Sequence, residues 1–500
     1  MQSIEFKGSF IDGAFHKVSK AEESWTINSP ADQSDEVISI EASYQDVDMA
    51  VEAAAKAFTS WSALPMNERI SHLQRLATVF DTHKEEMATI ISRETGKPLW
   101  ETRTEAGALS AKIKITIEES LDLVKDVRVA NALPSVEGVI RYKPKGVAVV
   151  LGPFNFPAHL PNGHFIPALV MGNTIVFKPS DKTPAVGQFM AELFRRAELP
   201  PGVFNMIQGK AEVGSRLVKH SDVNVILFTG SYDVGLRIKR DTLDHYWKSL
   251  ALEMGGKNAA IIWEDADLEK TVYENVVGSF LSAGQRCSCT SRMYVHEKIY
   301  DEYVDKFKKL TQGLKVGHWA KDHFMGSLID GDAYQRFFRF QEIAEREGAK
   351  AILAGEKVES EFEGFYVSPA IYEVSNVDAS SVYQKTEIFG PNVAVYKVKE
   401  LDQTLNLVNQ SSYGLSSAIF TKDKKNYERA VSKLDVGLLN WNRTTNGSSS
   451  RLPFGGTKKS GNGQPSAAFA VYYCSTPLAS LEDATAFDKT KIMPGIDYNI

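Results

Sequence analysis

The sequence predicts an α/β protein built around a mostly parallel β-sheet, and three observations indicate this fold class. Five short apolar runs occur without polar alternation, at 147–151, 174–177, 203–207, 225–228 and 259–262. Glycine, proline or polar residues follow each run, and helix-like segments lie between several of them. Strands that are covered by helices on both faces show this pattern. We therefore expect a parallel sheet with helices on either side from residue 146 onward.

Two amphipathic helices are predicted before this sheet. Apolar residues recur there at helical spacing: Val47, Val51, Ala54 and Phe58, then Ile70, Leu73, Ala77 and Phe80. The segment Gly96-Lys97-Pro98 is a helix stop signal. A second strand–helix series follows Arg292 and includes the apolar runs 417–420 and 436–439.

Length and composition limit the class of protein. A chain of 500 residues exceeds what one hydrophobic core organises, so two or three domains are expected. The formal charge of −6 provides no basic surface for nucleic acid. No apolar stretch reaches the roughly 18 residues that span a bilayer, and the N-terminus does not resemble a secretory signal. We expect a cytoplasmic protein without a membrane or nucleic-acid partner.

The three cysteines fit a reducing compartment. Cys287 and Cys289 are separated by one residue, and Cys474 lies far from both. An odd number with this spacing is not a disulfide framework. A Cys-x-Cys pair without further Cys or His nearby supplies too few ligands for zinc, so no metal site is predicted.

Cys287 is the candidate nucleophile. It stands in Gly284-Gln285-Arg286-Cys287-Ser288-Cys289, and a thiolate attacks carbonyl carbon well. Arg286 would favour the thiolate if its side chain faced the pocket, although a salt bridge elsewhere is an equal alternative. Taken alone, the cysteine could also be a small buried residue, and chemistry by itself does not exclude Cys289.

Polar motifs follow the predicted strands at their carboxyl ends, where parallel sheets bind ligands. Gly152-Pro153 follows the first run, Lys178 the second and Thr229-Gly230-Ser231 the fourth. The chain lacks Gly-x-Gly-x-x-Gly. Instead, Gly230-Ser231-x-x-x-Gly235 opens a helix after a buried strand, so that free N–H groups can face a pyrophosphate.

Several motifs occur together in one order along the chain. They are the segments 152–157, 178–181, 228–235, 252–257, 284–289, 387–391 and 453–456. In this order they resemble the aldehyde dehydrogenase superfamily, from about Phe10 to the C-terminus. Segments 155–164, 284–289, 440–442, 460–462 with 465–467, 479–482 and 494–497 resemble in particular the N-succinylglutamate semialdehyde dehydrogenases of bacterial arginine catabolism. Asp181 stands where that subfamily usually has Glu, and Lys257 where it usually has Asn.

The resemblance implies an aldehyde dehydrogenase-like fold with three parts. A Rossmann-type NAD-binding domain would comprise residues 1–122 and 145–253, and an α/β catalytic domain residues 254–460. A small β oligomerisation arm would comprise residues 123–144 and 466–486, with strands at 140–144 and 470–474, and Cys474 would serve packing. A homodimer or a dimer of dimers is expected.

The resemblance also implies the catalytic roles. Cys287 would form a thiohemiacetal with the aldehyde, and the Asn155 amide with the Cys287 backbone N–H would stabilise the alkoxide. Hydride transfer would leave a thioester, which water deprotonated by Glu253 would hydrolyse. Without the resemblance, Asn155 could be a turn residue between prolines and Glu253 a surface carboxylate.

The cofactor implied is NAD, with NADP as an alternative. Lys178 and Asp181 would contact the adenosine ribose, Glu387 the nicotinamide ribose, and Phe389 would lie beside the ring. The pyrophosphate would lie at the helix start, formed by Gly230, Ser231, Tyr232, Asp233, Val234 and Gly235. A carboxylate at Asp181 accepts hydrogen bonds from a ribose diol but repels a 2′-phosphate, which favours NAD.

The predicted reaction is NAD-dependent oxidation of N-succinyl-L-glutamate 5-semialdehyde to N-succinyl-L-glutamate. Arg443 would bind a carboxylate of this small-molecule substrate, unless it only anchors its loop through a salt bridge. Alternatives are a dehydrogenase of another semialdehyde or a general aliphatic aldehyde, and a structural or binding protein that retains the fold. The base Glu253 argues against a CoA-acylating relative, which would not need it.

Overall fold

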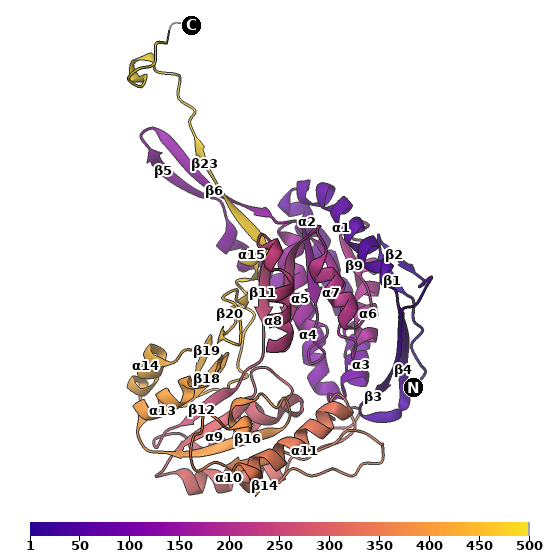
Figure 1. Cartoon of the computed structure of the whole chain (residues 1–500), viewed down its shortest axis with the longest axis vertical. Helices are drawn as coiled ribbons and strands as arrows, with labels where there is room; N and C mark the ends of the chain where they lie inside the picture. The colour runs from indigo at the N-terminus through magenta and orange to yellow at the C-terminus, as the bar shows by residue number, and fades with distance from the viewer. Residues whose placement is uncertain (499–500) are drawn as a thin grey trace.

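Two seven-stranded sheets form the body of the molecule, and a three-stranded sheet projects from it (Figure 1). The computed structural model describes residues 1–498. In this part of the chain, no helix combines the length and apolar character needed to cross a membrane. The mixed α/β architecture with parallel sheets confirms the predicted fold class.

The first sheet has the strand order β11-β10-β7-β8-β9-β1-β2. Its first five strands are parallel, whereas β1 pairs antiparallel with both β9 and β2. The strands are β1 (Ser9–Ile11), β2 (Ala14–His16), β7 (Val147–Leu151), β8 (Thr174–Lys178), β9 (Phe204–Met206), β10 (Val223–Thr229) and β11 (Ser249–Glu253).

Helices cover both faces of this sheet, which explains why its strands show no alternation. Along β7, Ala148 and Val150 belong to one core cluster, whereas Val147, Val149 and Leu151 belong to the other. The first cluster packs on α2 (Met66–Thr82), α3 (Lys84–Thr95), α4 (Leu99–Glu118), α5 (His159–Val170) and α6 (Pro184–Arg196). The second packs on α1 (Gln45–Ala63), α7 (Ala211–Lys219) and α8 (Tyr232–Asp241).

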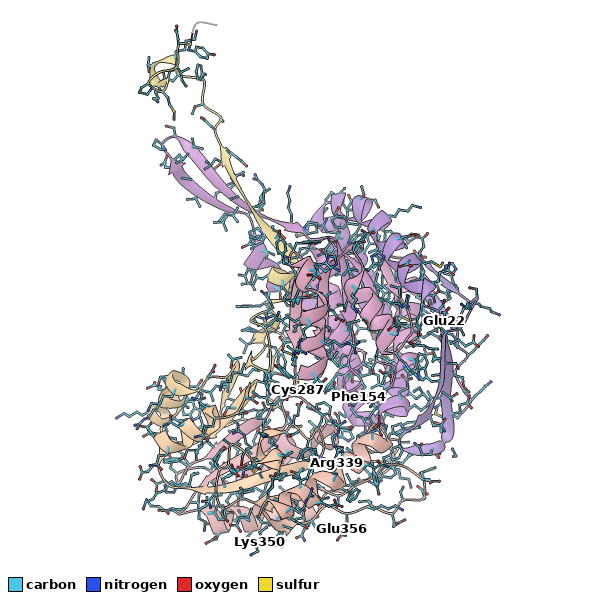
Figure 2. The ribbon with its side chains drawn as sticks, in the orientation of Figure 1. Glu22, Phe154, Cys287, Arg339, Lys350 and Glu356 are labelled. Carbon is cyan, nitrogen blue, oxygen red and sulfur yellow. The ribbon has the colours of Figure 1, made fainter. Side chains whose placement is uncertain are left out.

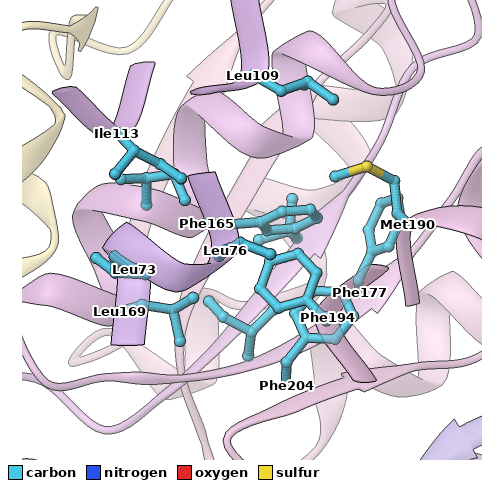
Figure 3. Packing of buried hydrophobic residues seen from close by; sticks show 14 of the residues in the cluster. Leu73, Leu76, Leu109, Ile113, Phe165, Leu169, Phe177, Met190, Phe194 and Phe204 are labelled. Atoms are coloured by element: carbon cyan, nitrogen blue, oxygen red, sulfur yellow. The ribbon is translucent and has the colours of Figure 1, made fainter. Parts of the chain in front are cut away.

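Aromatic rings fill the first cluster (Figure 3). The rings of Phe194 and Phe204 are stacked with centroids 3.8 Å apart. Phe165 meets Phe177 edge to face at 4.8 Å. These contacts join α5 and α6 to β8 and β9, so the cluster fixes how the helices lie on the sheet.

The predicted stop signal does end a helix. Helix α3 ends at Thr95, and Gly96 follows with a left-handed φ of 72°. A side chain at Gly96 would also collide with Ser327, because its Cβ would lie 2.0 Å from the Ser327 Oγ. Pro98 then precedes α4, since proline is compatible with the start of a helix but not with its continuation.

The second sheet has the strand order β14-β15-β16-β13-β12-β18-β19. The predicted run 259–262 lies in this sheet, in β12, and not beside the other four runs. Its strands are β12 (Asn258–Ile262), β13 (Thr290–His296), β14 (Lys350–Leu353), β15 (Ala370–Glu373), β16 (Asn392–Val398), β18 (Ser416–Phe420) and β19 (Leu438–Trp441). Its helices are α9 (Leu268–Phe280), α10 (Tyr300–Gln312), α11 (Gly331–Arg346), α13 (Leu401–Asn409) and α14 (Lys424–Lys433).

The projecting arm contains β5 (Val127–Leu133), β6 (Val136–Pro144) and β23 (Ser475–Glu482), all antiparallel. The predicted strand at 470–474 is wrong: Ala470–Tyr473 is the short helix α15, and the strand begins only at Ser475. Ala470, Val471, Tyr473 and Cys474 are buried in the first core cluster while Tyr472 is exposed, and this spacing of buried residues fits a helical turn and not a strand.

Short elements complete the fold. A hairpin of β3 (Glu23–Ser29) and β4 (Asp32–Ala42) lies near the N-terminus. The remaining elements are η1 (Ser120–Val124), η2 (Leu243–His245), η3 (Leu281–Gly284), α12 (Val382–Lys385), β17 (Tyr413–Gly414), β20 (Pro453–Phe454), β21 (Thr457–Lys458), β22 (Ser466–Ala467) and η4 (Lys489–Lys491).

Candidate active site

A cavity of about 1050 Å³ lies where the two sheets face each other. Figure 2 places Cys287 and Phe154 at this junction, with Arg339 below them. The lining combines the carboxyl ends of the first sheet with loops of the second. Of the predicted site residues, it includes Asn155, Asp181, Gly230, Ser231, Tyr232, Asp233, Val234, Glu253, Cys287, Glu387 and Phe389.

The carboxyl ends of four parallel strands form one wall of the cavity. Asn155 follows β7, Asp181 follows β8, Gly230 follows β10, and Glu253 is the last residue of β11. Parallel strands end at the same edge, so residues nearly 100 positions apart reach one cavity. Of the motifs that the sequence placed after strand ends, Gly152-Pro153 and Thr229-Gly230-Ser231 line the cavity, whereas Lys178 does not.

The chain crosses from the first sheet to the second between Glu253 and Asn258. This crossing contains two glycines that leave no room for a side chain. A Cβ at Gly255 would lie 1.9 Å from the Glu387 Oε2, and a Cβ at Gly256 would lie 2.5 Å from the Cys287 carbonyl oxygen. The crossing thus touches the candidate base, the candidate nucleophile and the Glu387 carboxylate.

The loop before Cys287 has an unusual backbone. Ser282, Ala283 and Gly284 have consecutive left-handed φ angles of 56°, 53° and 69°. Non-glycine residues adopt this conformation only at a cost in free energy, and such strain gathers at functional sites. The side-chain amide of Asn258 donates to the Cys287 carbonyl at 2.7 Å and fixes the position of the cysteine.

The surroundings of the Cys287 thiol oppose its ionisation. Burial is the main factor that raises the pKa of Cys287, and the Glu387 and Glu253 carboxylates add to it, while Arg286 acts in the opposite direction. A proton acceptor or a bound cationic group is therefore needed to populate the thiolate.

Arg286 lines the cavity and also forms a salt bridge. Its Nη2 lies 2.8 Å from the Glu101 Oε1, and its Nε donates to the Ser282 Oγ at 2.8 Å. The guanidinium lies over the Phe156 ring, 4.9 Å from the centroid. The Arg286 side chain therefore faces the pocket and forms a salt bridge at the same time, although the sequence analysis treated these as alternatives.

Cys289 is placed differently from Cys287. It is buried, it is absent from the cavity lining, and its Sγ lies 3.8 Å from the Leu281 carbonyl oxygen. Burial raises the pKa of Cys289 to about 11. Of the three cysteines, all free, Cys287 is the one that faces the cavity.

Glu253 is a buried carboxyl group with little to stabilise its charge. It is 5% exposed, and its Oε2 has no hydrogen-bond partner in the described structure. Burial raises the pKa of Glu253 well above its ordinary value, opposed only by a hydrogen bond from the Ser466 backbone. A raised pKa makes the Glu253 carboxylate a stronger proton acceptor than an ordinary carboxylate, which suits a general base.

Asn155 is held by a network that the sequence did not reveal. Its Nδ2 donates to the Gln285 carbonyl at 2.9 Å, which leaves its second N–H for another acceptor. The Asn155 carbonyl accepts a 2.7 Å hydrogen bond from Lys97, whose Nζ lies 2.6 Å from the Glu105 Oε2. Both side chains of this ion pair are at most 3% exposed. In the sequence, Lys97 stood only as part of a helix stop signal.

The start of α8 has the features of an anion site. Ser231 caps the helix, with its Oγ accepting from the Val234 N–H at 3.4 Å. Tyr232, Asp233 and Val234 of its first turn line the cavity, where N–H groups at a helix start can bind a phosphate oxygen. Gly235 lies outside the lining and allows close packing, because its Cβ would lie 2.4 Å from the Met254 Sδ.

Two further predicted site residues differ in whether they line the cavity. Lys178 lies outside the cavity lining, and its Nζ donates to the carbonyls of Pro179 at 2.9 Å and Gly209 at 2.6 Å. Burial lowers the pKa of Lys178 to about 8. Glu387 lines the cavity and accepts from the Gly256 N–H at 2.8 Å; burial raises the pKa of Glu387 to about 7.

A ribose fits these observations. Glu387 is half-buried and accepts from a single protein donor within residues 1–498, so hydroxyl groups can satisfy its other oxygen. Phe389 lines the cavity beside it, with its ring 5.7 Å from that of Phe154. Residues 1–498 contain no group of three His, Cys, Asp or Glu side chains placed to hold a metal ion.

Arg443 is not brought to the cavity. Its Nη1 lies 3.3 Å from the Glu274 Oε1, and the neighbouring Thr444 N–H donates to the other carboxylate oxygen at 2.8 Å. Its side chain is 66% exposed. This geometry matches the alternative in which Arg443 anchors its loop.

Comparison with other sequences gives one family. The model of the aldehyde dehydrogenase family matches residues 17–476. The N-succinylglutamate 5-semialdehyde dehydrogenase of Paraburkholderia xenovorans is 39% identical over 460 residues, which is 91% of this chain and 93% of that protein. The protein of the same name from Serratia proteamaculans is 36% identical over 493 residues, 98% of this chain and 99% of that one.

Solved structures agree. A putative aldehyde dehydrogenase from Burkholderia cenocepacia has a TM-score of 0.91 and 28% identity, and the match covers 98% of this chain and 99% of that one. Lactaldehyde dehydrogenase from Escherichia coli has a TM-score of 0.90 and 28% identity, with 97% and 100% covered. With Cys287, Glu253 and Asn155 on one cavity between two α/β sheets, the chain belongs to the aldehyde dehydrogenase family.

Proposed function

We propose that this enzyme oxidises N-succinyl-L-glutamate 5-semialdehyde to N-succinyl-L-glutamate with NAD, a step of arginine catabolism. Relatives that carry this name are 36–39% identical over nearly the whole chain. The observation that supports the chemistry most directly is that Cys287, Glu253 and Asn155 line one cavity.

The first step is attack by Cys287. The thiolate forms a C–S bond with the aldehyde carbon, and the carbonyl oxygen gains the negative charge. The second N–H of Asn155 and the Cys287 backbone N–H donate to this oxygen. Loss of one such donor costs about 3–4 kcal/mol of transition-state stabilisation.

A bound nicotinamide cofactor supplies the acceptor for the hydride that leaves the substrate carbon. This chain supplies the binding site, in which the start of α8 would hold the pyrophosphate and Glu387 would bind the nicotinamide ribose. The carboxyl ends of the first sheet and the loops of the second sheet enclose the reacting carbon together with Cys287.

Glu253 acts in the second half of the reaction. Its carboxylate takes a proton from water, and the hydroxide attacks the thioester carbon. The C–S bond breaks, the Cys287 thiolate is released, and the carboxylic acid product loses its proton to water and leaves as a carboxylate. The free Oε2 of Glu253 gives the water proton a place to go.

NAD is the cofactor we propose, because Asp181 contributes a carboxylate to the cavity next to the end of β8. This carboxylate accepts hydrogen bonds from the 2′-hydroxyl of NAD and repels the 2′-phosphate of NADP. Its shorter side chain, compared with Glu, makes the contact looser.

We also propose a cytoplasmic homo-oligomer, a dimer or a dimer of dimers, assembled through the arm. The arm exposes apolar side chains on strands whose outer edges are unpaired in the described chain: Val127, Val129, Leu133, Leu478 and Leu481. Exposed strand edges of this kind favour pairing with another chain.

A panel of aldehydes tests the proposal. The purified enzyme is assayed with N-succinylglutamate 5-semialdehyde, a semialdehyde without the succinyl group and an unbranched aliphatic aldehyde, each with NAD or NADP, and with and without CoA. The expected result is the highest kcat/KM for the succinylated substrate with NAD, independent of CoA. Equal kcat/KM for the aliphatic aldehyde would instead indicate a general aldehyde dehydrogenase.

A further inference from the structure

One face of α4 forms a wall of the cavity opposite the strand ends. The lining residues of this helix lie at helical spacing: Trp100, Glu101, Thr104, Glu105, Ala108 and Lys112. Three of them carry charge, and each of these three is at most 3% exposed. Buried charged side chains are almost always paired, so a partner is expected for each of the three.

The two acidic residues are already paired. Glu105 binds Lys97, with the Nζ 2.6 Å from its Oε2, and its Oε1 accepts from the Ala158 N–H at 3.1 Å. Glu101 binds Arg286 at 2.8 Å. Each carboxylate on this wall therefore has a cation of its own.

Lys112 is different. Its side chain is buried, with the residue 2% exposed, and its Nζ donates one hydrogen bond, to the Ala467 carbonyl at 2.8 Å. Within residues 1–498 it forms no salt bridge. An ammonium group has three donors, so two remain without a protein acceptor. Burial lowers the pKa of Lys112 to about 8, which leaves it mostly protonated at neutral pH.

A second donor group lies in the same region. His159 lines the cavity, and its Nδ1 is buried without a hydrogen-bond partner in the described structure. Burial is the main factor that lowers the pKa of His159; the Glu105 carboxylate acts in the opposite direction, and the positive charges of Lys112, Lys97 and Arg286 add to the lowering. The neutral ring can therefore donate one hydrogen bond into a region that carries a surplus of positive charge.

We propose that Lys112 and His159 form an anion-binding subsite on the α4 wall that holds a carboxylate of the substrate remote from its aldehyde. A buried cation costs several kcal/mol unless a counter-charge accompanies it, and the substrate provides that counter-charge. The subsite thus selects aldehydes with an acidic tail. This inference rests on the proposed function, because it names the group that recognises the proposed substrate.

The subsite binds the substrate carboxylate that was assigned to Arg443 from the sequence. Arg443 is exposed and forms an ion pair with Glu274, whereas Lys112 is buried and has N–H groups without a protein acceptor in the described structure. Ala467, which accepts from Lys112, has a left-handed φ of 58°, and the Ser466 backbone contacts Glu253. Lys112 and Glu253 are therefore joined to the neighbouring residues Ala467 and Ser466 and line the same cavity.

A purely structural role for Lys112 would consist of holding the Ala467 carbonyl. Lys112→Gln separates the two roles, because glutamine keeps an N–H donor but has no charge. Lys114→Met is the matched control, since Lys114 lies on the same helix and is exposed. Lys112→Met, which removes both the charge and the donor, is the second variant, and circular dichroism verifies that each variant is folded.

Steady-state kinetics are measured for N-succinylglutamate 5-semialdehyde and for an unbranched aliphatic aldehyde. With Lys112→Gln we expect kcat/KM for the dicarboxylic substrate to fall about 30-fold, equal to about 2 kcal/mol, mainly through KM. For the aliphatic aldehyde we expect a change of less than about threefold, as for Lys114→Met on both substrates.

Equal losses on both substrates would overturn the subsite and assign Lys112 to the backbone contact. An unchanged KM for the dicarboxylic substrate would overturn it as well. In both cases a wild-type preference for the dicarboxylic substrate would leave the proposed function intact. A wild-type enzyme without that preference would overturn the proposed function and the subsite together.

Discussion

The buried ion pair of Lys97 and Glu105 offers a sharp test of how the site is held. Lys97→Met removes the ammonium but retains an unbranched chain over the Phe156 ring, which the Nζ approaches to 4.2 Å from the centroid. The Glu105 carboxylate, which is fully enclosed, would then be left without its cation. The Asn155 carbonyl would also lose its 2.7 Å hydrogen bond.

The magnitude follows from this burial. Removing one partner of a buried ion pair costs about 3–5 kcal/mol, because the remaining charge is uncompensated. For a cooperative unit of about 150–250 residues, 1 kcal/mol corresponds to roughly 2–4 °C in Tm. We therefore expect Tm to fall by about 6–20 °C. Because Asn155 loses a constraint, we also expect kcat to fall by about tenfold or more.

A double variant completes the test. Glu105→Gln keeps an oxygen that can accept from the backbone N–H groups of Ala158 and His159 but carries no charge. In Lys97→Met with Glu105→Gln, no charge is stranded, so part of the loss should return. We expect a coupling free energy of about 2 kcal/mol or more, measured by calorimetry and by urea titration.

Two results would refute this reasoning. The first is additivity of the two substitutions within about 0.5 kcal/mol, which would show that the pair is not coupled. The second is wild-type kcat in a Lys97→Met variant that is clearly destabilised, which would show that the pair supports the fold but not the position of Asn155.

Three further predictions concern the chemistry. Cys287→Ser should abolish aldehyde oxidation while calorimetry still detects cofactor binding, whereas Cys289→Ser should retain turnover; the reverse pattern would identify Cys289 as the nucleophile. Glu253→Gln should leave a rapid release of one NADH per site followed by slow turnover, seen by stopped-flow absorbance, because only hydrolysis of the thioester needs the base. Burial raises the pKa of Glu253, and a base acts when deprotonated, so steady-state turnover of the wild type should rise as pH increases through that pKa; a flat profile would contradict the assignment. Asp181→Ser should raise kcat/KM with NADP relative to NAD by about tenfold, since the repulsion of a 2′-phosphate is removed, and an unchanged ratio would place the 2′-position elsewhere.

Strands β7, β8, β9 and β10 of the first sheet were predictable because each is buried on both faces. The exposed strand β2 was not among the predicted runs. The alternating residues of 147–151 enter two different cores, and this leaves a continuous apolar run in the sequence. The same property hides which sheet a strand joins. The run 259–262 is equally apolar, so nothing in its composition shows that it lies in the second sheet.

Short segments and buried charges were harder to predict. Ala470–Tyr473 is too short for its periodicity to separate a helix from a strand, and its tyrosines favour the strand by composition. Lys97 and Lys112 are charged residues on helices or at their ends, which ordinarily means exposure to solvent. The one available signal was the spacing of Glu101, Glu105 and Lys112, which places all three on one face of a helix.

The short crossing from Glu253 to Asn258 makes catalysis depend on the alignment of the two halves of the molecule. Gly255 and Gly256 meet Glu387 and the Cys287 carbonyl with no free space, so the crossing cannot tilt without displacing the groups at its ends. A rigid-body rotation of one sheet against the other would therefore change the relation between base and nucleophile directly. Enzyme activity therefore depends on how the two sheets are aligned. We expect mild denaturant to abolish activity at concentrations at which the circular dichroism is still that of the native enzyme.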